Sequence, residues 1–117
     1  MKNRKILIVE DEGMLLETWF LMFKKLGVDI LMASNGIEAV EVMENNQIDL
    51  IVTDLQMPIA DGFHVLEYIK ASNKDIITWV STGELSPCEE LDDFKIDKIV
   101  LKPFNMLREV REIMEIT

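Results

Sequence analysis

The chain has 117 residues, and 49% of them are hydrophobic, which is enough for the core of one compact domain. Its formal net charge of −10 opposes direct binding to nucleic acid or anionic lipid, because both are bound mainly through lysine and arginine. We therefore expect residues 1–117 to form a single domain whose partners are proteins or small ions.

The N-terminus and the single cysteine bear on localisation. A basic start leads into an apolar run at 6–9 that Glu10 ends, which is too short for a signal peptide or a membrane span. Cys88 is the only cysteine, so no disulfide can form within the chain. This usage is typical of a reducing compartment, and we expect a cytoplasmic protein.

The first half of the chain alternates between strand and helix patterns. Short apolar runs rich in β-branched residues predict buried strands over 6–9, 28–32 and 48–52. Apolar residues three or four apart predict a helix over 13–26, ended by Gly27, and a second over 36–45. Asn35 can cap the second helix, and Glu38 stands at the third helical position, as in a capping box.

The second half continues this alternation. Apolar runs predict strands over 76–80 and 98–101. Helical spacing predicts a third helix over 62–71 and a last helix that Asn105 caps. A fourth, short and acidic helix is expected over 88–94. Strands that alternate with helices imply right-handed crossovers, and hence a doubly wound α/β fold with a parallel sheet covered on both faces.

Polar side chains follow four of the predicted strands at their carboxyl ends. They are Glu10 and Asp11, Asp54, Ser81 and Thr82, and Lys102. In a doubly wound sheet these ends lie at one edge, where ligands bind. Carboxylates at close quarters repel one another unless a cation lies among them, and Mg²⁺ prefers such hard oxygen ligands. The sequence therefore predicts a divalent metal site at this edge.

A metal held by carboxylates, with a lysine opposite, is well suited to a phosphoryl group, because both neutralise charge on its oxygens. The best candidate nucleophile is Asp54, which follows a central strand and precedes a turn over 55–58. Aspartate is among the residues that form acyl phosphates. The residues thus indicate phosphoryl chemistry at Asp54.

Several motifs resemble the receiver domains of bacterial response regulators, over essentially the whole chain. They are the segment 6–12 (ILIVEDE), Asp54 with Met57-Pro58 and Asp61-Gly62 after it, Ser81, and Lys102-Pro103-Phe104. The resemblance implies a flavodoxin-like, chemotaxis-regulator-like fold: a five-stranded parallel sheet in the order 2-1-3-4-5 with five helices.

The resemblance also implies a role for each site residue. Asp54 is the phosphoacceptor, and it shares Mg²⁺ with Asp11, with the backbone carbonyl of Gln56 and, through water, with Glu10. The residues expected to bind the phosphoryl group are Ser81, Thr82 and Lys102. The Lys102–Pro103 peptide bond is cis in this family, a geometry available mainly before proline.

The chain departs from the commonest family pattern at the switch. The pair Ser81 and an aromatic residue usually moves on phosphorylation, but Ile99 stands at the aromatic position here. Thr82 occupies a position usually held by alanine or glycine, and Glu10 replaces an aspartate. We therefore expect the response to phosphorylation to be expressed in the segment 82–94 instead.

The function implied is a phosphoacceptor module of a two-component phosphorelay. It takes a phosphoryl group from a sensor histidine kinase or a histidine phosphotransfer protein, catalyses only its own modification, and signals to a downstream protein or output domain. One alternative is an aspartyl-phosphate phosphohydrolase, but such enzymes commonly place a second acid where Gln56 stands. Another is a receiver-like module that works without phosphorylation, which the intact Asp11, Asp54 and Lys102 disfavour.

Overall fold

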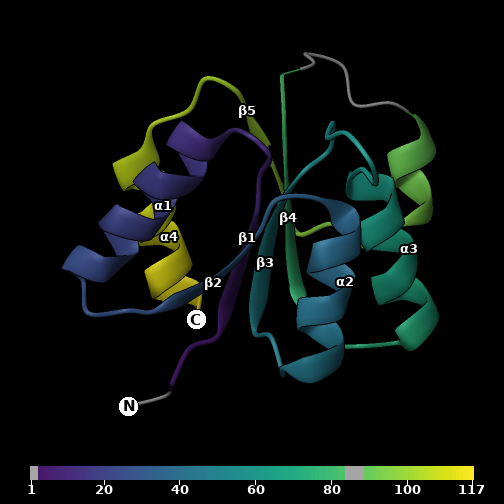
Figure 1. Cartoon of the computed structure of the whole chain (residues 1–117), viewed down its shortest axis with the longest axis horizontal. Helices are drawn as coiled ribbons and strands as arrows, with labels where there is room; N and C mark the ends of the chain where they lie inside the picture. The colour runs from purple at the N-terminus through teal and green to yellow at the C-terminus, as the bar shows by residue number, and fades with distance from the viewer. Residues whose placement is uncertain (1–2, 84–88) are drawn as a thin grey trace.

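The computed structural model describes residues 3–83 and 89–117. Its strands form one parallel sheet in the order β2-β1-β3-β4-β5 (Figure 1). The strands are β1 (Ile6–Val9), β2 (Ile30–Ala33), β3 (Leu50–Asp54), β4 (Ile77–Thr82) and β5 (Lys98–Leu101). Both the number of strands and their order agree with the sequence-based prediction.

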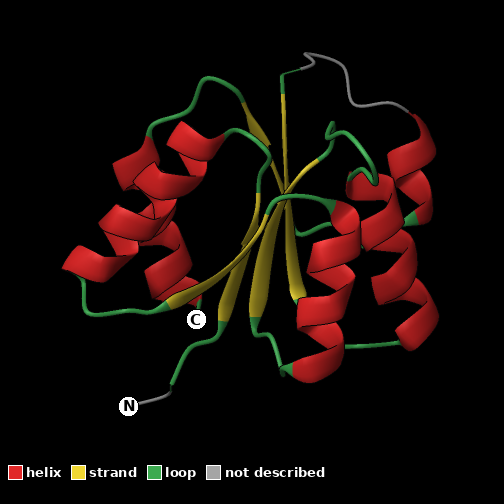
Figure 2. Cartoon of the chain, viewed as in Figure 1, coloured by secondary structure: helices red, strands yellow, loops and turns green. Residues whose placement is uncertain are grey.

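Helices cover both faces of this sheet, as Figure 2 shows. One face carries α1 (Gly13–Lys25) and α4 (Met106–Ile116), and the other carries α2 (Gly36–Asn45) and α3 (Gly62–Ser72). None of these helices, nor any other helix among the described residues, has the length and hydropathy needed to cross a membrane.

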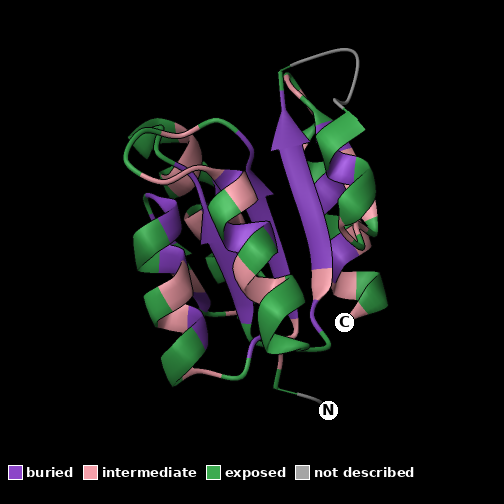
Figure 3. Ribbon diagram, turned by 90° about the vertical axis from the view of Figure 1, so that its right-hand side faces the viewer, coloured by how far each residue is buried: buried purple, intermediate pink, exposed green. Residues whose placement is uncertain are grey.

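The alternation of side chains along the strands builds two cores, one for each face of the sheet. Ile6 and Ile8 of β1 pack with α1 and α4 residues such as Trp19 and Val110. Leu7 and Val9 face the other way and pack against α2 and α3. The strands are consequently buried between helices whose outer surfaces are exposed (Figure 3).

The structure corrects the expectation of a fourth α-helix over 88–94. The described part of it is a single 3₁₀ turn, η1 (Glu89–Asp93), while Cys88 lies outside the described residues. The turn closes with an i+3 hydrogen bond from the amide of Phe94 to the carbonyl of Leu91, at 3.1 Å. Four acids in five residues disfavour a longer helix, and short segments commonly adopt 3₁₀ geometry.

The second strand begins two residues later than the pattern predicted, because Val28 is hydrogen-bonded to the last turn of α1. Gly27, with φ of 75°, donates its amide to Lys24, and Val28 donates to Phe23, which together form a Schellman motif. The third and fourth strands, in turn, extend two residues beyond their predicted ends. Asp54 is therefore the last residue of β3 itself.

Candidate functional site

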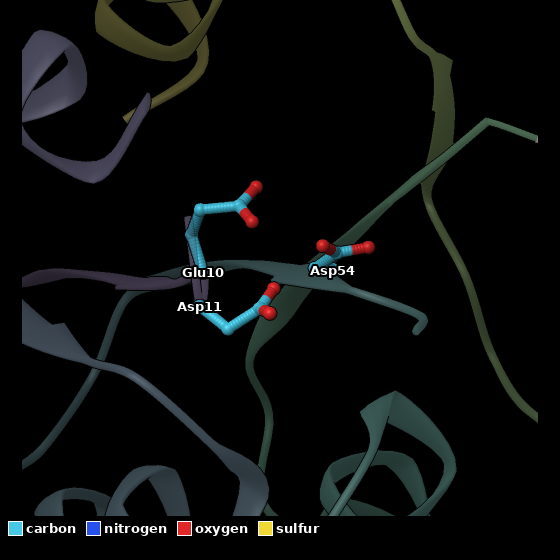
Figure 4. A group of neighbouring side chains, drawn as sticks. All are labelled: Glu10, Asp11 and Asp54. Atoms are coloured by element: carbon cyan, nitrogen blue, oxygen red, sulfur yellow. The ribbon is translucent and has the colours of Figure 1, made fainter. Parts of the chain in front are cut away.

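Three acidic side chains meet at the carboxyl edge of the sheet. Glu10 and Asp11 directly follow β1, and Asp54 ends the neighbouring strand β3. One carboxylate oxygen of each residue lies within 4.8 Å of the others (Figure 4). Glu10 and Asp54 are buried, whereas Asp11 is exposed to solvent.

A lysine from the last strand's end completes the cluster. The ammonium of Lys102 donates to Asp54 Oδ2 at 2.9 Å and to Glu10 Oε1 at 3.0 Å. Its backbone is fixed by a hydrogen bond from the Lys102 amide to the Thr82 carbonyl, at 2.8 Å. The following Lys102–Pro103 peptide bond is cis, the geometry that the resemblance implies.

The electrostatics of the cluster are dominated by burial. The pKa of Glu10 is raised to about 7, first by burial and second by the neighbouring Asp54 carboxylate, while the hydrogen bond from Lys102 acts against this. Burial acts to lower the pKa of Lys102, but its hydrogen bonds to Asp54 and Glu10 outweigh this and raise it. The cluster contains three acids and one lysine, so negative charge exceeds positive charge at the site.

Two further backbone contacts hold the carboxylates in place. The Glu12 amide donates to Glu10 Oε2 at 3.2 Å, and the Gln56 amide donates to Asp54 Oδ1 at 3.2 Å. Because these donors are main-chain groups, no residue type in the sequence could have revealed them. Gly62 allows the chain to pass close to Asp54, since a Cβ at this position would lie 2.5 Å from the Asp54 carbonyl oxygen.

The remaining residues singled out in the sequence lie on β4 and β5. Ser81 pairs with Asp54 in the β3–β4 register, and both Ser81 and Thr82 are buried. Ile99 pairs with Val80 and packs in the small apolar cluster beneath η1. The structure therefore places Ser81 beside Asp54 at the carboxyl edge, with Thr82 as the last residue of the same strand, and Ile99 in the apolar cluster that contains Val80.

Residues 6–114 match the family model of the response regulator receiver domain. The chain belongs to this family. As a receiver domain it is a phosphoacceptor signalling module of two-component systems, which catalyses its own modification and is not a classical enzyme. The match confirms the resemblance that the motifs indicated.

Curated relatives of this receiver domain differ greatly in length. It is 29% identical over 117 residues to sporulation initiation phosphotransferase F of Bacillus subtilis, covering 98% of this chain and 94% of that protein. It is 28% identical over 117 residues to the regulator of RpoS of Escherichia coli K12, covering 96% of this chain. The chain spans only 34% of the length of that second relative.

Solved structures of receiver domains share its fold. Chemotaxis response regulator CheY4 of Vibrio cholerae superposes with a TM-score of 0.86 at 22% identity, over 99% of this chain and all of that chain. The receiver domain of sensor histidine kinase PA1611 of Pseudomonas aeruginosa PAO1 has a TM-score of 0.82 at 24% identity, over 97% and 96% of the two chains. That domain was solved with a magnesium ion coordinated in its active site cleft.

Proposed function

We propose that Asp54 is the phosphoacceptor of this receiver domain and that the phosphoryl donor is a phosphohistidine on a histidine kinase or a histidine phosphotransfer protein. One observation carries the proposal. Asp54 ends a central strand, and its carboxylate lies both in the acidic cluster and 2.9 Å from the Lys102 ammonium. We further propose that residues 1–117 act as one receiver domain in the cytoplasm, upstream of a protein partner or output domain.

The transfer is a displacement at phosphorus. A carboxylate oxygen of Asp54 forms the new bond, the phosphorus–nitrogen bond of the phosphohistidine breaks, and its electron pair returns to the imidazole. Lys102 offsets the charge on the phosphoryl oxygens, and the Ser81 and Thr82 hydroxyls at the end of β4 are proposed to donate to them. Attack of water on the same phosphorus then releases phosphate and restores the carboxylate.

The donor set fits a Mg²⁺ ion. Three carboxylates with one lysine leave unbalanced negative charge, and the raised pKa of Glu10 reflects how poorly this charge is tolerated in a buried position. We propose that Asp11, Asp54 and the Gln56 carbonyl hold the ion directly, with Glu10 acting through water. When bound, Mg²⁺ supplies further neutralisation of phosphoryl charge.

The proposal is tested by intact-mass measurement after incubation with acetyl phosphate and Mg²⁺. We expect one phosphoryl adduct per chain, sensitive to hydroxylamine as acyl phosphates are, and no adduct on the variant Asp54→Asn. An undiminished adduct on Asp54→Asn would show that another residue is the acceptor.

A further inference from the structure

The loop between β3 and α3 carries Gln56 and returns the chain from Asp54 to Gly62. Its ends are joined by a hydrogen bond from the Gly62 amide to the Leu55 carbonyl, at 3.0 Å. The end of the loop at Gly62 is thereby tied to Leu55, the residue after Asp54.

The outer side of the loop lies against the first residue of α2. Gly36 donates its amide to the Ala60 carbonyl at 2.7 Å. A Cβ at Gly36 would lie 2.8 Å from the Asp61 carbonyl oxygen and 2.9 Å from that of Ala60. Both distances are shorter than real Cβ contacts, and both partners are backbone atoms, so no side chain can simply turn away.

The α2 side of this contact is rigidly fixed. Asn35 caps the helix by accepting from the Glu38 amide at 2.9 Å, and the Glu38 carboxylate accepts from the Ser34 amide at 3.0 Å. Ala39, one turn further, is fully buried in the core. We therefore expect an atom added at Gly36 to displace the loop rather than the helix.

The loop side is already constrained. Ile59 has φ of 73°, and the Ala60 amide donates to the Pro58 carbonyl at 2.8 Å, which is the pattern of a γ-turn with positive φ. A β-branched residue is strained in this region and persists there only when its surroundings hold it. The hydrogen bond from Gly36 to Ala60 is one such restraint.

We infer that Gly36 is a positioning residue for the phosphorylation site: it clamps the loop so that the Gln56 carbonyl and Asp54 are held in the geometry that binds Mg²⁺. This inference rests on the proposed function of Asp54. Because coupling between two contacts is reciprocal, Mg²⁺ binding must in turn strengthen the hydrogen bond from Gly36.

The first test compares Mg²⁺ binding by calorimetry in Gly36→Ala and Gly13→Ala. Gly13 is a matched control, since it is the first residue of α1 and a Cβ there meets nothing within 4 Å. A third variant, Val40→Ala on α2, controls for loss of stability. We expect Gly36→Ala to weaken Mg²⁺ binding by about fivefold or more, and both controls to bind as the parent does.

The second test uses the unaltered protein and remains decisive if Gly36→Ala does not fold. Amide exchange should show slower exchange at Gly36 when Mg²⁺ is added, by a factor of about three or more, with little change at Ala39. The inference is overturned if Gly36→Ala binds Mg²⁺ as tightly as Gly13→Ala, or if Mg²⁺ binds without slowing exchange at Gly36. Failure of the unaltered protein to become phosphorylated would instead remove the proposed function itself.

Discussion

At the scale of single residues, the strained turn that follows Asp54 leads to a prediction about stability. Ile59 has φ of 73° and is 81% exposed, so its strained backbone destabilises the fold and burial of its side chain does not offset this. Glycine has no Cβ to clash in this conformation, and Ile59→Gly should increase the free energy of unfolding by about 1 kcal/mol, measured by urea denaturation.

The chain contains its own control for this change. Asn73 also has a positive φ, of 53°, at the end of α3. The substitution Asn73→Ile puts a β-branched residue into the left-handed conformation and should lower the free energy of unfolding by about 1 kcal/mol. Equal stabilities of Ile59→Gly and the parent protein would show that Ile59 is not strained.

A second residue-scale prediction concerns a buried acid away from the site. Glu109 of α4 is fully buried and accepts from Lys98 at 2.6 Å and from Arg108 at 3.1 Å. Burial acts to raise its pKa, but the hydrogen bonds from Lys98 and Arg108 outweigh this, and the pKa of Glu109 is lowered below 4.5. Glu109→Gln should therefore cost about 2 kcal/mol at pH 7.

The pH dependence of this cost has a definite sign. Since the folded-state pKa of Glu109 is the lower one, its contribution is present above the ordinary value of 4.5 and is lost as the pH falls through the folded-state value. The difference between Glu109→Gln and the parent should shrink accordingly in acid. Glu112→Gln is the matched control: it removes a carboxylate that also pairs with Lys98 but is 42% exposed, and should cost about 0.5 kcal/mol or less. Comparable costs for the two variants at pH 7 would contradict this interpretation.

At the scale of elements, the bounds of a helix or strand were predicted correctly where the local sequence pattern alone determines them. The strands over 6–9 and 98–101 were predicted with the observed bounds, because each is a short apolar run between polar residues. The start of β2 was not, since Val28 is apolar but is used by the end of α1. The expected α-helix over 88–94 was wrong for its described part, since residues 89–93 form a 3₁₀ helix in which four acids repel one another.

The candidate site follows the same division. Its acids and Lys102 could be predicted, because a parallel sheet brings the carboxyl ends of its strands to one edge. Gly36 could not, because its contact with Ala60 joins segments far apart in the sequence. The local sequence around a glycine in the first turn of a helix gives no sign of such a contact.

The switch makes a prediction at this scale. Ile99 packs with Leu91 and Phe94 in one apolar cluster, and it cannot rotate as an aromatic ring would. We expect that beryllofluoride, added to Mg²⁺-loaded protein, changes amide exchange most in the segment 82–94, of which 84–88 lie outside the described residues, and little in α2. A change centred on β5, or an unaltered response in Ser81→Ala, would refute this.

At the scale of the whole molecule, folding and metal binding should be linked. The proposed Mg²⁺ site exists only where folding brings the acids of the cluster together, so an ion bound there should stabilise the folded state. At ten times its dissociation constant it should add about 1.4 kcal/mol to the free energy of unfolding, which is an increase of about 5 °C in Tm. Asp11→Ala should lose this increase, and a Tm insensitive to Mg²⁺ in the parent protein would exclude the metal site.

The central claim, that Asp54 receives the phosphoryl group, is tested most directly by locating the modification. Borohydride reduces an aspartyl phosphate to homoserine, so peptide mapping after phosphorylation and reduction identifies the acceptor by its mass. We predict homoserine at position 54 alone, dependent on Mg²⁺. Conversion at Asp11, or at any other aspartate in place of Asp54, would contradict the claim.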